Sequence, residues 1–171
     1  MEGVSVVSKR CRELEQGLRD PRWIDNPAGL MTWLGGLTGV EDCIADGLRH
    51  ASASEDWLAF ELYALAAYRH PSRAYTSQLC GVLGRQIDEV NIEDIVDVLA
   101  EIADPAAVGC LEETLWWQPP WDEYRQLAVK CVWALAAIGT SDAVRVLQEA
   151  ASTEDGPIRE AAARMLGTPR A

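Results

Sequence analysis

The stretch LAEIADPAAVGCLEETL (Leu99–Leu115) recurs later in the chain as LAAIGTSDAVRVLQEAA (Leu135–Ala151). A shift of 36 residues (135 minus 99) aligns the leucines that open the two copies and places Leu111 on Leu147. In both copies apolar residues recur every three or four positions, which is the spacing of one helix face. A fixed period of this size indicates a helical repeat architecture, and Leu111 and Leu147 are predicted to lie in its core.

Helical spacing extends over most of the remaining chain. A first helix is expected over residues 4–19, and a second begins near Pro27 with Asn26 as its N-cap. No stretch shows the sustained alternation of a β-strand. The sequence therefore predicts an all-α fold of about nine helices in a single domain over residues 1–171. Residues 1–52 are expected to form divergent N-terminal helices, and residues 53–167 the repeat units and a C-terminal cap helix.

The two copies resemble HEAT repeats, in particular the short variety of the phycobilisome lyase-type HEAT proteins. That pattern has an Ala/Leu-rich first helix ending in L-x-x-I-G-D, then A-V and a second helix with leucine spacing. Residues 158–167 match the first-helix part once more, so the resemblance covers somewhat over half of the chain. It implies a short right-handed α-solenoid. The arginine common in the first helix is present as Arg159, whereas Ile92 and Ala128 stand in its place in the two preceding units.

The charge of the chain is negative and unevenly distributed. The 171 residues carry a formal net charge of −12, and between Arg85 and Arg125 eleven acids occur without a single lysine or arginine. Such a stretch repels nucleic acid phosphates and attracts a basic protein surface. The alternative interpretation is that the acids serve solubility alone.

The five cysteines are scattered, odd in number and never spaced as C-x-x-C. This spacing predicts reduced, buried thiols in a cytoplasmic protein, with neither a disulfide framework nor a zinc site. The N-terminus lacks the layout of a secretory signal, and no apolar run approaches the roughly 20 residues of a membrane span. The protein is therefore expected to bind no membrane.

A segment rich in tryptophan and proline follows the first copy of the repeat, and its residues are the candidate binding site. Tryptophan is enriched at binding hot spots, and prolines keep such a loop stiff. We predict partner binding by Glu112, Glu113, Trp116, Trp121, Asp122 and Glu123. The alternative is that the tryptophans cover the gap between two repeat units. Trp33, Trp57 and Trp133 lie in apolar helices and are predicted to be core residues.

No residue pattern indicates catalysis. His50 and His70 are both expected at helix ends, where an imidazolium interacts favourably with the helix dipole. Neither lies in a known nucleophile motif, and the glycines form no phosphate loop. Carboxylate pairs such as Glu112 and Glu113 are interpreted as solvated helix faces. We therefore expect no catalytic residues, no metal and no cofactor.

These observations favour a non-enzymatic protein-binding module, such as an inhibitor or immunity-type protein that neutralises a basic partner. One alternative, implied by the resemblance, is a lyase-type HEAT protein acting on a bilin chromophore. A second is a DNA-binding HEAT protein of the alkylpurine glycosylase sort. That class needs a basic groove, which the acidic second half of the chain disfavours. The sequence does not determine the oligomeric state.

Overall fold

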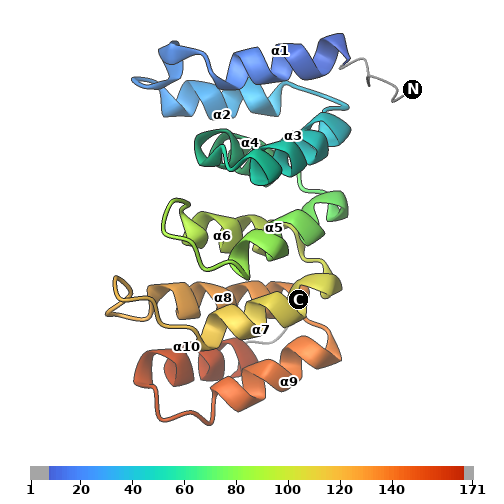
Figure 1. Cartoon of the computed structure of the whole chain (residues 1–171). Helices are drawn as coiled ribbons and strands as arrows, with labels where there is room; N and C mark the ends of the chain where they lie inside the picture. The colour runs from blue at the N-terminus through green and yellow to red at the C-terminus, as the bar shows by residue number, and fades with distance from the viewer. Residues whose placement is uncertain (1–7, 168–171) are drawn as a thin grey trace, which may run out of the picture. The chain divides into compact units, whose positions relative to one another are not determined.

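The computed structural model describes residues 8–167, and these residues form ten α-helices, three short 3-10 helices and no β-strand (Figure 1). The all-α prediction is therefore confirmed for this part of the chain. The expected first helix begins at Lys9, and its predicted residues 4–7 lie outside the described range. The chain divides into two compact units, Met1–Tyr75 (unit 1) and Thr76–Ala171 (unit 2).

Unit 1 contains two helical hairpins. In it α1 packs against α3, α2 against α4, and α3 against α4. Asn26 caps α2 by accepting a hydrogen bond from the Gly29 N–H at 2.9 Å, as the sequence predicts. The helices are α1 (Lys9–Leu18), α2 (Pro27–Gly35), α3 (Glu41–Ser54) and α4 (Trp57–Arg69), with the 3-10 helices η1 (Pro21–Trp23) and η2 (Arg73–Tyr75).

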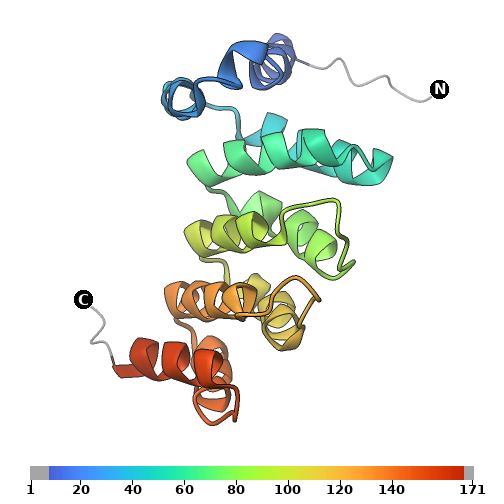
Figure 2. The same ribbon diagram turned by 90° about the vertical axis from the view of Figure 1, so that its left-hand side faces the viewer.

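Unit 2 contains three further hairpins. Helices α6, α8 and α10 follow one another on one side of the unit, and α5, α7 and α9 on the other (Figure 2). Within the unit α8 contacts α6, α7, α9 and α10. The helices are α5 (Thr76–Leu83), α6 (Ile92–Ile102), α7 (Val108–Trp116), α8 (Gln126–Ile138), α9 (Ser141–Ala150) and α10 (Gly156–Gly167), with η3 (Pro105–Ala107) before α7.

The two sequence copies end their first helices in the same way. Gly139, after α8, has φ 65°, and its N–H donates to the Leu135 carbonyl at 3.0 Å. Ala103, which lies 36 residues earlier, has φ 50° and donates to the Leu99 carbonyl at 3.0 Å. Both residues are therefore left-handed C-caps, although only glycine adopts this conformation without steric cost.

The predicted core leucines are buried. Leu111 is 0% exposed and Leu147 1%, so the interpretation of these residues as one repeated seam is supported by their burial. Trp133 is a different case, because it is 47% exposed and the prediction that it is a core residue is wrong. Helix α8 is apolar almost all round, but its neighbours leave the face that carries Trp133 open. Trp33 and Trp57 are half-buried.

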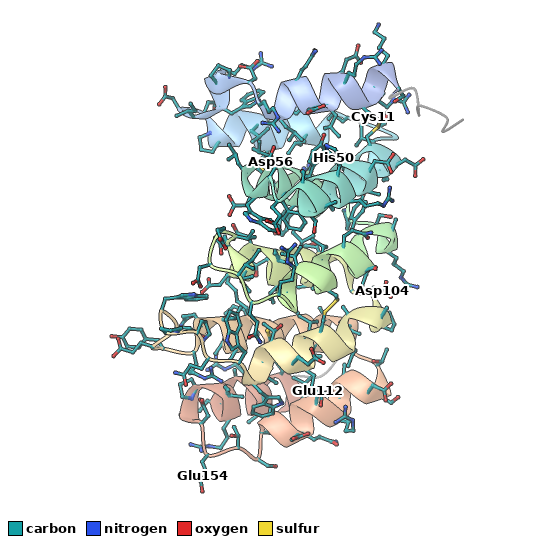
Figure 3. The ribbon with its side chains drawn as sticks, in the orientation of Figure 1. Cys11, His50, Asp56, Asp104, Glu112 and Glu154 are labelled. Carbon is teal, nitrogen blue, oxygen red and sulfur yellow. A yellow bond between two sulfur atoms is a disulfide. The ribbon has the colours of Figure 1, made fainter. Side chains whose placement is uncertain are left out.

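Four of the five cysteines form disulfides, so the prediction of reduced thiols is wrong for them. Cys11 of α1 pairs with Cys43 of α3 across a Cα–Cα distance of 5.0 Å, and Cys80 of α5 pairs with Cys110 of α7 across 5.5 Å. The partners are 32 and 30 residues apart, close to one repeat, so they meet on neighbouring helices (Figure 3 shows the sulfur–sulfur bonds). Cys131 is free and buried.

Among residues 8–167, no helix is both long and apolar enough to cross a membrane.

The two left-handed caps allow a reciprocal exchange. Ala103→Gly should stabilise the protein by roughly 0.5–1 kcal/mol. Glycine has no Cβ to clash in the left-handed conformation, and this gain exceeds the larger backbone entropy that glycine loses on folding. Gly139→Ala should destabilise it by about 1 kcal/mol for the opposite reason. Urea unfolding of the two variants measures both effects. Loss of stability in Ala103→Gly would contradict the assigned cap geometry.

The cysteine pairing predicts a specific thiol count. Unfolded without reductant, the protein should expose one reactive thiol, Cys131, and after reduction all five. In the native protein Cys131 should react slowly, because burial raises the pKa of its thiol and the thiolate is the reactive form. Closing loops of this length should add about 3–4 kcal/mol of stability per disulfide, which reduction removes.

A Cys80→Ser/Cys110→Ser double variant provides the control. Reductant should lower its unfolding midpoint less than that of the wild-type protein, because one of the two disulfides is already absent. Five reactive thiols in the unfolded, unreduced wild-type protein would show that the disulfides do not form.

Candidate protein-interaction surface

The predicted binding segment forms the loop between α7 and α8, WQPPWDEYR over residues 117–125. Proline cannot continue a helix, and Pro119 and Pro120 keep the chain from doing so after α7. Two backbone hydrogen bonds fold the loop back on itself: the Asp122 N–H donates to the Pro119 carbonyl at 3.0 Å, and the Arg125 N–H donates to the Asp122 carbonyl at 3.3 Å. The loop therefore has a defined shape.

A buried arginine holds this loop in place through hydrogen bonds. Arg125 is 7% exposed, and its guanidinium donates from Nη2 to the Leu115 carbonyl at 3.2 Å and from Nη1 to the Trp117 carbonyl at 3.1 Å. Its Nε donates to Asp155 Oδ2 at 2.9 Å, just before α10. One side chain thus joins the end of α7, the loop and the start of α10. Sequence reasoning did not select Arg125, because its partners lie 8 to 30 residues away.

The last residue of α7 and the anchored loop present aromatic side chains to solvent. Trp116 is 39% exposed, Trp121 49% and Tyr124 71%. Glu113 and Glu123 are exposed beside them in the chain. Four of the six predicted binding residues, the two tryptophans and these two glutamates, are therefore accessible to a partner. Tyr124 is added to these candidate binding residues because it is exposed on the same loop. The sequence alone did not indicate its exposure.

Asp122, which the sequence predicts as a binding residue, is buried instead of exposed. It is 3% exposed, and its Oδ1 accepts a hydrogen bond from the Gln126 N–H at 2.6 Å at the start of α8. Its Oδ2 is buried as well. The helix begins with unsatisfied N–H groups, and the carboxylate turns inward to satisfy one of them.

Glu112 is largely neutralised by a neighbour. Both of its carboxylate oxygens accept hydrogen bonds from Arg145 of α9, at 3.2 and 3.0 Å. The hydrogen bonds from Arg145 to Glu112 are the main reason why the pKa of Arg145 is raised. Figure 3 shows Glu112 on α7. Its role in the structure is thus to join α7 to α9, and it contributes less charge to a partner than its sequence context suggests.

A second basic residue compensates part of the acidic stretch. Lys130 of α8 lies 2.6 Å from Asp97 Oδ2 and 3.4 Å from Glu93 Oε2, both on α6. Burial alone would lower the pKa of Lys130, but the hydrogen bond to Asp97 and the charges of Asp97 and Glu93 outweigh it and raise the pKa. The eleven acids are therefore uninterrupted in sequence but not in space.

Unit 1 holds a separate open pocket of about 940 Å³ between α1, α3 and α4. Several of its charged side chains are paired: Arg19 lies 3.0 Å from Asp56 and 3.8 Å from Glu15, and Asp46 lies 2.6 Å from Arg49, which is outside the lining. The backbone N–H of Ala59 and then Arg19 lower the pKa of Asp56. The pocket thus shows a self-compensated set of charges, and it does not include any of the predicted binding residues.

The two histidines are placed differently from each other. His70 follows α4 as its C-cap residue, as predicted, and its Nε2 lies 2.8 Å from the Leu34 carbonyl. His50 lies inside α3, which continues to Ser54, so its prediction as a helix end is wrong (Figure 3). Ser54 is the last residue of α3, and Asp56 caps α4 by accepting a hydrogen bond from the Ala59 N–H at 3.0 Å.

Among the described residues, no group of three or more histidine, cysteine, aspartate or glutamate side chains is arranged to hold a metal ion.

No protein-family model matches the chain, and no curated protein matches it in sequence. The geometry of the loop and its surroundings is therefore the basis on which a function is proposed.

The anchoring role of Arg125 leads to a stability prediction. Arg125→Ala should cost about 3 kcal/mol, because it removes a buried guanidinium that donates to two carbonyls and to the half-buried carboxylate of Asp155. Arg125→Lys should cost less, since lysine keeps the charge but lacks the planar fork. Urea unfolding measures both costs.

Arg159→Ala is the matched control. Arg159 also donates to two backbone carbonyls, those of Thr153 and Glu154 at 3.2 Å each, but it is exposed. Its loss should cost less than about 1 kcal/mol. Equal costs at Arg125 and Arg159 would show that the buried guanidinium does not hold the loop.

Proposed function

We propose that the chain is a non-enzymatic protein-binding module that binds a basic partner through the surface formed by Glu113, Trp116, Trp121, Glu123 and Tyr124. The observation that carries the proposal is the exposure of Trp116 at the end of α7 and of Trp121 and Tyr124 on the adjoining loop, which Arg125 holds in place. Rigid aromatic side chains lose little entropy on binding and dominate many interfaces. The exposed glutamates would steer a basic partner toward them.

We further propose that the hairpins form a short, right-handed HEAT-like α-solenoid. Support comes from the interactions that join neighbouring hairpins within each unit. Their partners are separated by nearly one repeat: 33 residues for Lys130 and Asp97, 33 for Arg145 and Glu112, and 36 for His70 and Leu34. In a repeat protein each unit contacts mainly its neighbours, so a near-constant separation is expected.

An inhibitor or immunity-type protein is the narrower role that we propose. A net charge of −12 favours a basic partner such as a cationic toxin or nuclease over nucleic acid. The role requires contact alone, and the exposed aromatic loop supplies a place for that contact.

The disulfides favour an oxidising compartment as the location of the protein. The predicted cytoplasmic location depended on reduced cysteines, and four of them are paired. Disulfides persist mainly in oxidising compartments, so the pairing favours such a compartment over the cytoplasm. Alkylation of free thiols in intact cells, followed by a count of the protected cysteines, distinguishes the two.

The binding proposal is tested with the partner captured from a lysate of the source organism by the full-length protein. The partner should be basic, and its association rate should fall as salt rises, because ions screen the field of the carboxylates. Trp116→Ala and Trp121→Ala should chiefly speed dissociation, each by about tenfold or more if the residue is a hot spot. Glu113→Lys and Glu123→Lys should chiefly slow association. Surface plasmon resonance resolves both rates.

Glu154→Lys serves as the matched charge control. Glu154 is exposed in the segment between α9 and α10 (Figure 3), so reversal there changes the net charge equally but not the charge of the loop. Its association rate should fall less than that of Glu113→Lys. An acidic partner, a rate independent of salt, or unchanged dissociation in both tryptophan variants would refute the proposal.

A further inference from the structure

A groove lies between α8 and α10 in unit 2, apart from the residues predicted from sequence. It is open and has a volume of about 460 Å³. Its lining comes from the end of the loop, from α8 and from α10: Tyr124, Gln126, Val129, Trp133, Gly156, Pro157, Glu160, Ala161 and Arg164. The groove accounts for the exposure of Trp133, which no other feature of the fold explains.

The two helices present apolar side chains to the groove in rows. Val129 and Trp133 are four residues apart on α8, and Pro157 and Ala161 are four residues apart on α10. Residues with this spacing form the ridges along which helices pack against each other. Tyr124 at 71% exposure and Trp133 at 47% leave much aromatic surface uncovered. A groove of this form fits the apolar stripe of a third helix.

The charge beside the groove is negative. Helix α6, which packs against α8, carries Glu93, Asp97 and Glu101, and the single base of α8, Lys130, meets the first two of these acids. On α10 the groove is lined by one acid and one base, Glu160 and Arg164. Three carboxylates of α6 against one lysine leave a negative flank on the helix that neighbours α8.

We infer that this groove binds an amphipathic, basic helix of a partner protein. The apolar stripe of the helix lies between Val129, Trp133 and Ala161, and a row of lysines or arginines beside that stripe faces the carboxylates of α6. Charge complementarity selects this occupant, because the flank repels an acidic segment and also a second copy of this acidic chain. The inference rests on the proposed function. It adds a second contact site and specifies that the segment of the partner bound there is helical and basic.

The test uses a synthetic probe and the full-length protein. The probe is a fluorescein-labelled 18-residue peptide of leucine and lysine, with leucines at helical positions i, i+3, i+4 and i+7. The control peptide has the same composition, with its leucines distributed evenly around the helix. Fluorescence anisotropy should show the amphipathic peptide binding at least tenfold more tightly than the control, because the charge of the two peptides is equal and only the stripe differs.

Two variants at exposed aromatic residues locate the binding. Trp133→Ala should weaken binding of the amphipathic peptide about tenfold, and Trp133→Phe should restore most of it. Tyr68→Ala is the matched control, since Tyr68 is an aromatic residue of comparable exposure, 39% against 47%, but lines neither the groove nor the proposed loop surface. It should leave peptide binding unchanged. Circular dichroism before each titration confirms that the variants are folded.

A charge variant tests the flank. Glu101→Lys on α6 should weaken peptide binding several-fold at low salt and less at high salt, whereas Glu149→Lys on α9 should have a smaller effect. Equal effects of the two reversals would show attraction to net charge alone and would overturn the inference.

Three other results would also overturn it: equal binding of both peptides, equal loss in Trp133→Ala and Tyr68→Ala, or dimerisation of the chain that Trp133→Ala abolishes in sedimentation velocity. The inference and the proposed function fail separately. If the natural partner is insensitive to Trp116→Ala and Trp121→Ala, the proposed loop surface fails while peptide binding to the groove is still measurable. If the partner depends on the loop but neither it nor the peptide depends on Trp133, the groove fails and the loop surface stands.

Discussion

The burial of helix α8 is the constraint on which the rest of unit 2 depends. Its side chains Leu127, Ala128, Val132 and Leu135 are all 0% exposed, although a single hairpin partner can cover only one side of a helix. The remaining coverage comes from α6 on one side and α10 on the other. The hairpin of α7 and α8 thus depends on its neighbours in unit 2 for burial of its apolar surface.

Arg125 lets this buried helix begin where it does. The residue before α8 has φ 59°, a left-handed conformation that costs energy for any side chain except glycine. An arginine is nevertheless present, because its guanidinium satisfies carbonyls at the end of α7 and a carboxylate before α10. The same contacts hold the aromatic loop in shape. Stability and the presentation of the candidate binding surface therefore depend on one side chain.

Electrostatic interactions between hairpins also change how the surface is understood. Lys130 and Arg145 reach back by 33 residues each to carboxylates of the acidic stretch. These contacts reduce the charge at Glu112 and along α6. The exposed negative charge that remains is carried by residues such as Glu113, Glu123 and Glu101. A partner would contact the carboxylates that Lys130 and Arg145 do not compensate, together with the aromatic side chains that the hairpins leave uncovered.

By itself the sequence determined that the chain is helical, that one helical stretch recurs after 36 residues and that Leu111 and Leu147 are buried, because helix spacing and caps such as Asn26 are set by residues within about four positions. It also identified Trp116 and Trp121 as candidate binding residues, since they belong to a segment rich in tryptophan and proline. Only the tertiary structure decided that Asp122 turns inward, that Trp133 borders a groove, that Glu112 meets Arg145 and that four cysteines pair. Each of these outcomes depends on backbone placement or on a partner about one repeat away, and the positions of such partners follow from how the hairpins pack.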